Sequence, residues 1–328
     1  MGANLEKEEF CMADKIKIGL YGRNGHQIQK KLDGHPDAEL CAVCMPGEAP
    51  QVPDGVRVYS SLAEMLADDS IDLISLCSPK RSDQAADAMA CLRAGKHVYA
   101  EKPAALSEEI LGEIFRTSDE AGREFHEMAD SIFYEPYWTV KNIMQSGKIG
   151  EVVQVYAQKS YPSNFGKRPC DEETDGGLIR WVGIHAVRFV EHITGIYVKD
   201  VRAMETHHGA DTGIFTAASL AMSLENGGVA SVAMNYLNPA GFPGWGNESV
   251  RVFGTRGMVE LTDGGQRTHL YTDRDEGELD VTVSDCRDYF DLLMRHFRYG
   301  EALPLTREEE FHPLRVVIRA KDTAETVG

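Results

Sequence analysis

The feature that most constrains the fold is a regular alternation of short apolar runs with helical segments over residues 15–121. Buried strands are predicted at 15–23, 40–45, 71–77 and 96–100. Helical segments are predicted between and after them, at 27–32, 61–67, 83–94 and 107–121. Strands that alternate with helices form βαβ units, whose right-handed crossovers build a parallel sheet. The first part of the chain is therefore predicted to be a doubly wound α/β domain.

The pattern changes after the helix at 107–121, and longer strands dominate from residue 150 onward. These strands are predicted at 151–161, 197–207, 214–225, 228–237 and 249–262, with helices at 177–194, 285–299 and 306–323. Turns such as Asn226-Gly227-Gly228 favour hairpins. We therefore expect a disordered leader (1–14), the doubly wound domain (15–124) and an α+β domain with a large open, mainly antiparallel sheet (125–328).

The charge balance excludes several classes of function. The chain has 34 basic and 52 acidic residues, a net charge of −18, which would repel the phosphates of a nucleic acid. No apolar run is long enough to cross a bilayer. The seven cysteines are an odd number, which favours reduced thiols over a disulfide framework. Together these features predict a cytoplasmic protein with no nucleic-acid partner and no membrane partner.

A glycine-containing turn follows the first strand. Its residues are Gly22, Arg23, Asn24, Gly25 and His26. Dinucleotide-binding turns place glycines where backbone N–H groups approach the pyrophosphate at a helix N-terminus. Gly22 can be the first glycine of the G-x-G-x-x-G pattern, and Asn24, which tolerates unusual φ angles, stands at the second. We predict that this turn binds NAD or NADP.

The end of the second strand does not decide between these two cofactors. An acid is expected there for NAD, but the strand ends at Met45, and no basic residue stands in its place. Glu48 follows three residues later, so the choice of cofactor stays open.

The segment from Gly95 to Pro103 carries the best candidate for chemistry. A helix ends at Gly95, a short apolar strand follows, and the strand stops at Glu101 and Lys102. The proline biases Lys102 toward an extended backbone and so presents it in a defined direction. A surface lysine is usually only solvated. One at the carboxyl end of a strand in an α/β sheet instead faces the crevice where ligands bind, so we expect Lys102 to act there.

A second candidate lies between Gly176 and Arg188. Two glycines open an apolar helix in which Trp181 and His185 stand four residues apart, on one face. Histidine can act as an acid or a base near neutral pH. A lone helix histidine is more often structural, but the glycine-rich entry and the nearby tryptophan favour a functional role for His185.

Several motifs occur in a fixed order along the chain. They are Ser78-Pro79, Gly95-Lys96-His97-Val98, Glu101-Lys102-Pro103, Gly147-Lys148-Ile149-Gly150-Glu151, Gly176-Gly177, Gly183-Ile184-His185 and Phe253-Gly254-Thr255-Arg256-Gly257. This order resembles the glucose–fructose oxidoreductase/inositol dehydrogenase/MocA-like (Gfo/Idh/MocA) family. The resemblance implies a Rossmann domain followed by an α/β domain with an open sheet. It also implies NAD(P)-dependent chemistry on a sugar or polyol hydroxyl, and a homodimer or homotetramer paired through the C-terminal sheet.

The resemblance also assigns site residues. It places Lys102 beside the nicotinamide and the substrate hydroxyl, and it makes His185 the acid/base. The cofactor would be held by the glycine turn together with Ser78, Pro79, Glu101 and Lys102. The substrate would contact Lys102, Trp181 and Tyr134, and no metal is implied.

Four positions depart from the family pattern. Trp181 and Arg188 stand where the family has aspartates before and after the histidine, Phe133 replaces an arginine, and Gln84 replaces a histidine. A carboxylate beside His185 would hold its tautomer and raise its basicity. A tryptophan cannot do so, but its flat face suits stacking on a sugar ring.

The leading hypothesis is an NAD(P)-dependent oxidoreductase acting on a hydroxyl of a sugar, polyol or sugar derivative. In it, His185 would take the hydroxyl proton and Lys102 would stabilise the developing alkoxide. One alternative is an NAD-dependent glycosidase or lyase that oxidises a sugar transiently and then restores the cofactor. The other is a sugar- and dinucleotide-binding regulator with weakened catalysis, suggested by the missing aspartate at position 181.

Overall fold

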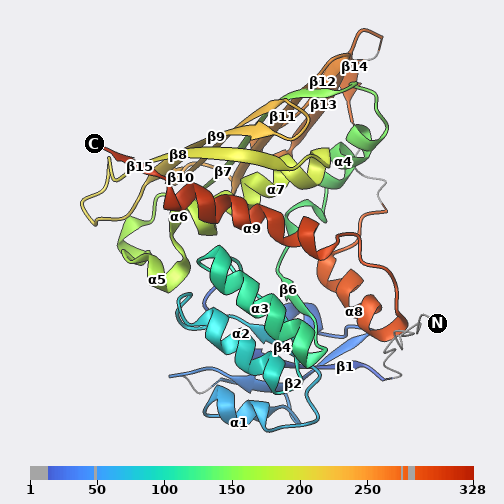
Figure 1. Ribbon diagram of the computed structural model, residues 1–328, viewed down its shortest axis with the longest axis vertical. Coiled ribbons are helices and arrows are strands. Elements are labelled where there is room, and N and C mark those ends of the chain that lie inside the picture. Colours follow the sequence, from blue (N-terminus) through green and yellow to red (C-terminus); the bar gives the residue numbers. More distant parts are fainter. Residues whose placement is uncertain (1–13, 48–49, 275, 280–284) are drawn as a thin grey trace, which may run out of the picture.

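The computed structural model of the protein describes residues 14–47, 50–274, 276–279 and 285–328. The predicted leader, apart from its last residue, and Glu48 lie outside these ranges. The described chain forms two β-sheets. Figure 1 shows the first sheet at one end of the molecule and the second, which contains the later strands, at the other, with helices between them.

Six strands form the first sheet, in the order β3-β2-β1-β4-β5-β6. They are β1 (Ile16–Tyr21), β2 (Ala38–Cys44), β3 (Arg57–Val58), β4 (Leu73–Leu76), β5 (His97–Ala100) and β6 (Phe125–Glu127). All neighbours run parallel, so the predicted doubly wound sheet is confirmed. This is the strand order of dinucleotide-binding folds, with the topological switch between β1 and β4. β6 begins at Phe125, just past the predicted end of the first domain at residue 124, and it still belongs to the first sheet. The division of the chain into domains stays a prediction.

Three α-helices accompany this sheet in the described chain, α1 (Leu62–Leu66), α2 (Gln84–Arg93) and α3 (Glu108–Ala121). Ser107 caps α3, because its side chain accepts a hydrogen bond from the backbone N–H of Ile110. Gly122 ends the same helix in the left-handed conformation, at φ +59°. The helix predicted at 107–121 therefore begins and ends where its capping residues place it.

The helix predicted at 27–32 is only one turn of 3-10 helix, η1 (Gln29–Leu32). Gly34, at φ +70°, and Pro36 follow within a few residues, and β2 already begins at Ala38. The connection is thus too short and too interrupted for an α-helix. In consequence, the glycine turn does not lead directly into an α-helix N-terminus.

Nine strands form the second sheet, in the order β14-β13-β12-β11-β7-β10-β9-β8-β15. They are β7 (Val152–Pro162), β8 (Val198–Thr206), β9 (Ala217–Leu224), β10 (Val229–Asn238), β11 (Asn247–Gly254), β12 (Gly257–Thr262), β13 (Arg267–Thr272), β14 (Glu276–Glu278) and β15 (Glu325–Val327). Neighbours are antiparallel except for the parallel pairs β7–β10 and β8–β15. The strand predicted at 249–262 is two strands joined by a tight turn at Thr255 and Arg256.

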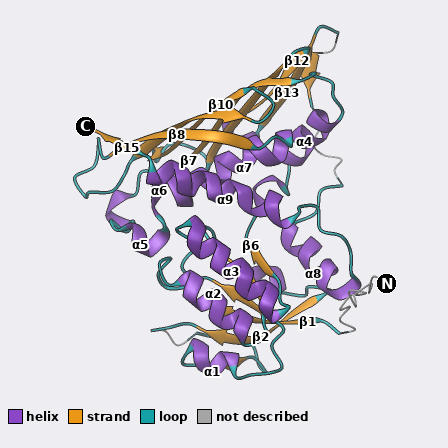
Figure 2. Ribbon diagram, in the orientation of Figure 1, coloured by secondary structure: helices purple, strands orange, loops and turns teal. Residues whose placement is uncertain are grey.

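Helices cover one face of this sheet, as the purple ribbons in Figure 2 show. The later helices are α4 (Tyr137–Gln145), α5 (Glu172–Asp175), α6 (Gly177–Trp181), α7 (Gly183–Thr194), α8 (Tyr289–Tyr299) and α9 (Arg307–Asp322), with short 3-10 turns η2 (Asp130–Ile132), η3 (Phe165–Lys167) and η4 (Asp263–Gly265). α7 packs on β7 and β10, and α9 packs on α7 and β8. The helix predicted at 177–194 is broken at Val182 into α6 and α7. Within the described residues, no helix is long and apolar enough to span a membrane.

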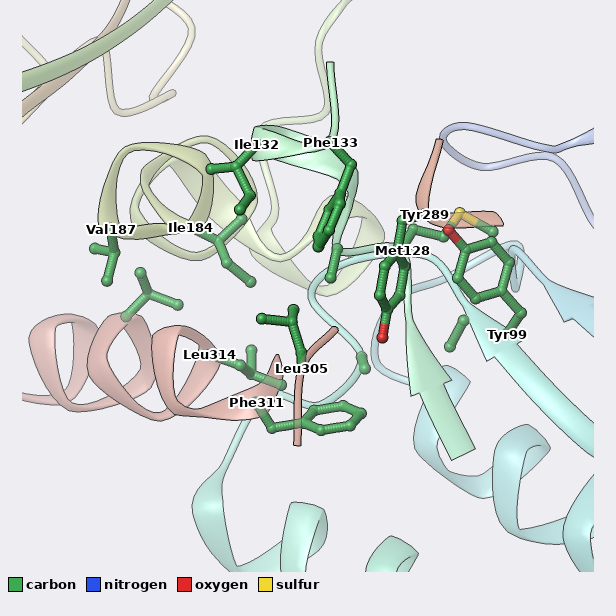
Figure 3. Packing of buried hydrophobic residues seen from close by; sticks show 14 of the residues in the cluster. Tyr99, Met128, Ile132, Phe133, Ile184, Val187, Tyr289, Leu305, Phe311 and Leu314 are labelled. Carbon is green, nitrogen blue, oxygen red and sulfur yellow. The ribbon is translucent and has the colours of Figure 1, made fainter. Parts of the chain in front are cut away.

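A buried cluster ties η2 to the helices around it (Figure 3). Ile132 of η2 and Ile184 of α7 belong to this cluster, and the two elements are in contact. Phe133 is 2% exposed, and its ring centre lies 4.9 Å from that of Tyr289. The residue that replaces an arginine of the family pattern is therefore part of the core. The same packing fixes η2 against the start of α7, and both contribute to the site described next.

Candidate active site

A cavity of about 420 Å³ lies where the carboxyl ends of β1, β5 and β6 face the second sheet. Its lining residues are His26, Gln27, Ile28, Lys30, Lys31, Tyr99, Glu101, Lys102, Met128, Asp130, Tyr134, Lys159, Tyr161, His185, Trp245, Gly246 and Glu248. The cavity thus joins residues that follow the glycine turn to both predicted catalytic residues. This is the position in which open α/β sheets bind ligands.

The glycine turn leaves no room for side chains at its two glycines. Gly22 has φ +65°, and a Cβ there would stand 2.1 Å from the carbonyl oxygen of Cys77. Gly25 has φ +123°, and a Cβ there would stand 2.6 Å from the carboxyl carbon of Glu101. Both positions combine a left-handed backbone with a close approach, which only glycine tolerates. Such a turn fits the close backbone contact that a dinucleotide requires.

Two other predicted cofactor-binding residues, Asn24 and Pro79, hold the shape of this turn, whereas Ser78 bonds to α2. The amide Nδ2 of Asn24 donates to the carbonyl oxygens of Pro79 at 3.1 Å and Thr174 at 2.5 Å. The hydroxyl of Ser78 donates to Asp87 at 2.7 Å. Asn24 therefore fastens the turn both to the corner after β4 and to α5 of the second part of the chain.

Glu101 anchors the other side of the turn. Its carboxylate is fully buried and accepts hydrogen bonds from the backbone N–H of His26 at 2.8 Å and from the His26 ring at 3.1 Å. Burial alone would raise the pKa of Glu101, but the charge and hydrogen bond of His26, together with the charge of Lys102, lower that pKa to about 2. Glu101 is therefore a buried anion that orders the turn.

Lys102 is buried, with 1% of its surface exposed. Its Nζ donates to the backbone carbonyl of Trp181 at 2.8 Å and lies 3.8 Å from the Glu101 carboxylate. Burial lowers the pKa of Lys102 to about 7; the charge of Glu101 opposes this shift, whereas the charges of Arg81 and Lys159 add to it. A lysine that titrates near neutral pH can give up or accept a proton there.

His185 lies in the first turn of α7 and is 8% exposed. Its Nδ1 is 2.7 Å from the hydroxyl of Ser131, and its Nε2 is buried without a partner in the described residues. Burial, and then the positive charge of Lys102, hold the pKa of His185 well below its usual range. The imidazole is therefore neutral at neutral pH.

Trp181 does not line the cavity. Because the helix breaks at Val182, Trp181 ends α6 while His185 lies in α7. The Trp181 ring lies 4.1 Å from the Nζ of Lys102 and stacks on His26 at 6.5 Å between ring centres. Trp181 thus contacts the Lys102 ammonium group without lining the cavity. The aromatic residues that line the cavity are Tyr134, Tyr161 and Trp245.

A buried ion pair in the cavity wall is not among the residues that the sequence motifs predict. Lys159 of β7 pairs with Glu248 of β11, directly across the two strands. Both side chains occupy the inward positions of strands whose other inward residues are apolar, such as Val155 and Val250. A charged residue in the apolar phase of a strand is the signal that could have found them.

Two further residues that differ from the family pattern, Arg188 and Gln84, are buried and make hydrogen bonds to the backbone. Arg188 is fully buried, pairs with Glu127 and donates to the carbonyl of Met128, so it supports the fold at the end of β6. Gln84 donates to the carbonyls of Glu101 and Pro103, at 2.5 and 3.1 Å. Gln84 therefore holds the backbone on both sides of Lys102.

This strand order, with a turn that requires glycine at two positions and lies beside a buried lysine and histidine, is that of a dinucleotide-dependent oxidoreductase. The protein families whose patterns match this chain are consistent with that class. The description "Oxidoreductase family, NAD-binding Rossmann fold" matches residues 17–128, and "GFO/IDH/MocA C-terminal domain" matches residues 137–260. The chain belongs to the Gfo/Idh/MocA family of oxidoreductases, and its cofactor is NAD or NADP.

Individual relatives extend this finding. An uncharacterized oxidoreductase of Rhizobium meliloti is 38% identical over 335 residues, 95% of this chain and 98% of its own. The NADP⁺-dependent scyllo-inositol 2-dehydrogenase of Bacillus subtilis is 23% identical over 95% of this chain and 94% of its own. Inositol 2-dehydrogenase 2 of Saccharopolyspora erythraea is 27% identical, but the match covers 43% of this chain and 40% of that relative.

Solved structures share the fold. The WlbA dehydrogenase of Chromobacterium violaceum, in complex with NADH and UDP-GlcNAcA, aligns with a TM-score of 0.77 and 21% identity. The alignment covers 94% of this chain and 93% of that one. The likeness extends over both sheets, which confirms the predicted fold class for the whole described chain.

Proposed function

We propose that the protein is an NAD(P)-dependent dehydrogenase that acts on a CH–OH group of a sugar, polyol or sugar derivative. The observation that carries this proposal is that Lys102 and His185, whose Nε2 has no partner among the described residues, both line the cavity that begins at the glycine turn. A hydroxyl oxygen between these two groups would meet one group that can exchange a proton and one that can form a hydrogen bond. The names of the inositol dehydrogenases among the relatives support the substrate class.

The cofactor would lie along the turn from Gly22 to His26. Backbone groups of the turn and Arg23 would face its phosphates, with Ser78 at the neighbouring corner, while Pro79 and Glu101 would keep the turn in shape. The bound nicotinamide would accept or supply the hydride, which is the chemistry that the protein itself lacks.

The substrate would occupy the part of the cavity between Lys102 and the second sheet. Tyr134, Tyr161 and Trp245 offer apolar surface for a ring. The ion pair of Lys159 and Glu248 offers a donor and an acceptor side by side, which suits two neighbouring hydroxyl groups.

Two measurements on the purified protein test this function. Native mass spectrometry would identify retained NAD or NADP, and absorbance at the reduced nicotinamide band would follow turnover across a panel of inositols, aldoses and sugar acids. Accumulation of NAD(P)H with at least one polyol or sugar supports the proposal. Product formation without NAD(P)H would favour the glycosidase or lyase alternative. Sugar and dinucleotide binding without any redox exchange would favour the regulator.

We also propose that copies of the chain pair in the cytoplasm as homodimers or homotetramers, through the uncovered face of the nine-stranded sheet. That face exposes the side chains of Tyr156, Met204 and Val229, which are 43%, 52% and 49% exposed. Apolar residues gathered on one sheet face are typical of subunit contacts. Light scattering at several concentrations tests this proposal, and a monomer throughout would contradict it.

A further inference from the structure

We propose that Ser131 is a positioning residue that fixes His185 in the tautomer protonated on Nε2, so that His185 offers the substrate oxygen a neutral N–H donor and not a base. The proposal deepens the function proposed above and depends on it only in naming the oxygen that receives this hydrogen bond. The state of the imidazole itself follows from the contacts of the two side chains.

The two residues are held together by the core. Ser131 is 1% exposed, and its hydroxyl lies 2.7 Å from Nδ1 of His185. Their immediate neighbours, Ile132 and Ile184, belong to the buried cluster that joins η2 to α7 (Figure 3). Because the backbones on both sides are packed, the hydroxyl has a fixed partner.

The count of hydrogen atoms then decides the tautomer. A serine hydroxyl has one hydrogen to donate and can also accept. In the described residues, the Ser131 hydroxyl has a hydrogen bond with Nδ1 alone. If Nδ1 donated to this hydroxyl, the buried hydroxyl hydrogen would have no acceptor there. If the hydroxyl donates to Nδ1, the hydroxyl hydrogen and the Nδ1 lone pair are both satisfied, and the imidazole proton is on Nε2, which is then the one group of the pair left for a ligand.

The surroundings keep a second proton off the ring. His185 is buried, and the positive charges of Lys102, Lys159 and Arg188 all act against an imidazolium. Nε2 has no partner in the described residues, and His185 lines the cavity, so the N–H is available to a ligand. A neutral imidazole used as a hydrogen-bond donor to a substrate carbonyl is an established way to stabilise a developing oxyanion.

The absence of an acid beside the ring is what permits this state. A carboxylate can only accept, so it would require a proton on Nδ1 and leave a basic lone pair on Nε2. Here position 181 holds a tryptophan, and the group on Nδ1 is a hydroxyl that can donate. Because the partner of Nδ1 in this protein can donate, the imidazole proton can remain on Nε2.

This state divides the chemistry between the two catalytic residues. In the oxidative direction, the substrate O–H proton passes to the lone pair of neutral Lys102 Nζ, which becomes an ammonium group. A bound nicotinamide would supply the acceptor for the hydride that leaves the hydroxyl-bearing carbon, and the oxygen of the resulting C=O group would accept a hydrogen bond from Nε2–H of His185. Reduction runs the same steps backward, and His185 keeps its proton throughout.

Nuclear magnetic resonance of the full chain labelled with ¹⁵N-histidine tests the proposal without substrate or turnover. The His185 signals are assigned by their loss in the variant His185→Gln. We expect the pattern of a neutral, Nε2-protonated ring between about pH 6 and 8. A ring protonated on Nδ1, or on both nitrogens, would overturn the proposal, whether or not the protein proves to be a dehydrogenase.

Two variants separate positioning from packing. Ser131→Ala removes the donor and should give a mixture of tautomers, with kcat lower by roughly tenfold and the KM for cofactor unchanged. Ser131→Thr keeps the hydroxyl and should keep the wild-type tautomer. Wild-type ring signals in Ser131→Ala would contradict the role of Ser131. Thermal unfolding verifies that both variants are folded, and if Ser131→Ala is not, the wild-type spectrum still decides the tautomer.

Discussion

The Nζ of Lys102 donates a hydrogen bond of 2.8 Å to the backbone carbonyl of Trp181 and lies 4.1 Å from the centre of the Trp181 ring. Lys102 follows β5 of the first sheet, whereas Trp181 ends α6 beside the second sheet. The lysine is thus oriented by a residue from the other half of the molecule. The hydrogen bond is to the backbone of residue 181, and the second contact is to the face of its indole ring. Lys102 is therefore held at this position without an aspartate there.

Replacing Lys102 tests whether it exchanges a proton. Lys102→Ala should lower kcat at least ~100-fold, because both the proton carrier and the positive charge are lost. Lys102→Arg keeps a charge that cannot be deprotonated, so it should be nearly as inactive. Steady-state kinetics measure the effect, with the exposed Lys148→Ala as the control. An active Lys102→Arg would show that charge alone is needed.

The pH profile should follow Lys102. Because its pKa is about 7, the neutral amine that accepts a proton forms as the pH rises through 7. The rate of oxidation should therefore rise through this pH and the rate of reduction should fall. The measurement is kcat/KM against pH in both directions. A flat profile around pH 7 would contradict the assignment.

Removing a neighbouring charge should move that profile. The positive charge of Lys159 lowers the pKa of Lys102, so the double variant Lys159→Gln with Glu248→Gln should shift the midpoint to higher pH. The paired change avoids leaving Glu248 as a buried unpaired anion. The matched control is the double variant Arg251→Gln with Glu260→Gln, which removes an ion pair between β11 and β12. It should leave the midpoint of the pH profile unchanged. A midpoint that stays or falls in the first variant would refute the coupling.

The glycine turn should not accept a methyl group. In Gly25→Ala the new Cβ would collide with the carboxyl group of Glu101, so dinucleotide binding should weaken at least ~10-fold as the turn shifts. Gly34→Ala is the control, because Gly34 also has a positive φ but no atom stands within 4 Å of its Cβ position. Fluorescence titration with NADH and NADPH measures both variants. Equal losses in the two would mean that backbone strain, and not contact with Glu101, is responsible.

A buried histidine should make stability depend on pH. Burial alone would lower the pKa of His126, but the carboxylates of Glu310 and Glu124 raise that pKa to about 9. The stabilisation is therefore complete below pH 6.5, the pKa of the histidine in the unfolded chain, and it disappears as the pH rises through the folded pKa of about 9. The free energy of unfolding of the wild type minus that of His126→Gln should shrink by about 3 kcal/mol over this interval.

Chemical denaturation at a series of pH values measures this difference. His192→Gln is the control, since burial lowers the pKa of His192 to about 3 and the ring is neutral in both the folded and the unfolded state above about pH 7.5. Its difference from the wild type should be constant between about pH 7.5 and 9. A constant difference for His126→Gln as well would contradict the linkage.

The parts of the fold and site that could be predicted are those set by local sequence. The alternation of apolar runs gives the parallel sheet, and the proline after Lys102 marks the strand end where the lysine is presented. Ser107 and Gly122 delimit α3 through contacts within a few residues. His185 could be singled out because glycines mark the segment that leads to it.

The parts that could not be predicted depend on contacts between distant segments. Ser131 and His185 are separated by 54 positions and meet because η2 packs on α7. The pairing of Lys159 with Glu248 requires the register of β7 on β11. Periodicity alone also could not show the break at Val182, which moves Trp181 out of the cavity wall.

The two hydrogen bonds of Asn24 have a mechanical consequence. One amide group joins the glycine turn to the corner at Pro79 and to Thr174 of the opposite half of the molecule. The position of the turn is therefore set by both halves of the molecule, so the backbone surface that it offers to a dinucleotide depends on how the second half packs against the first.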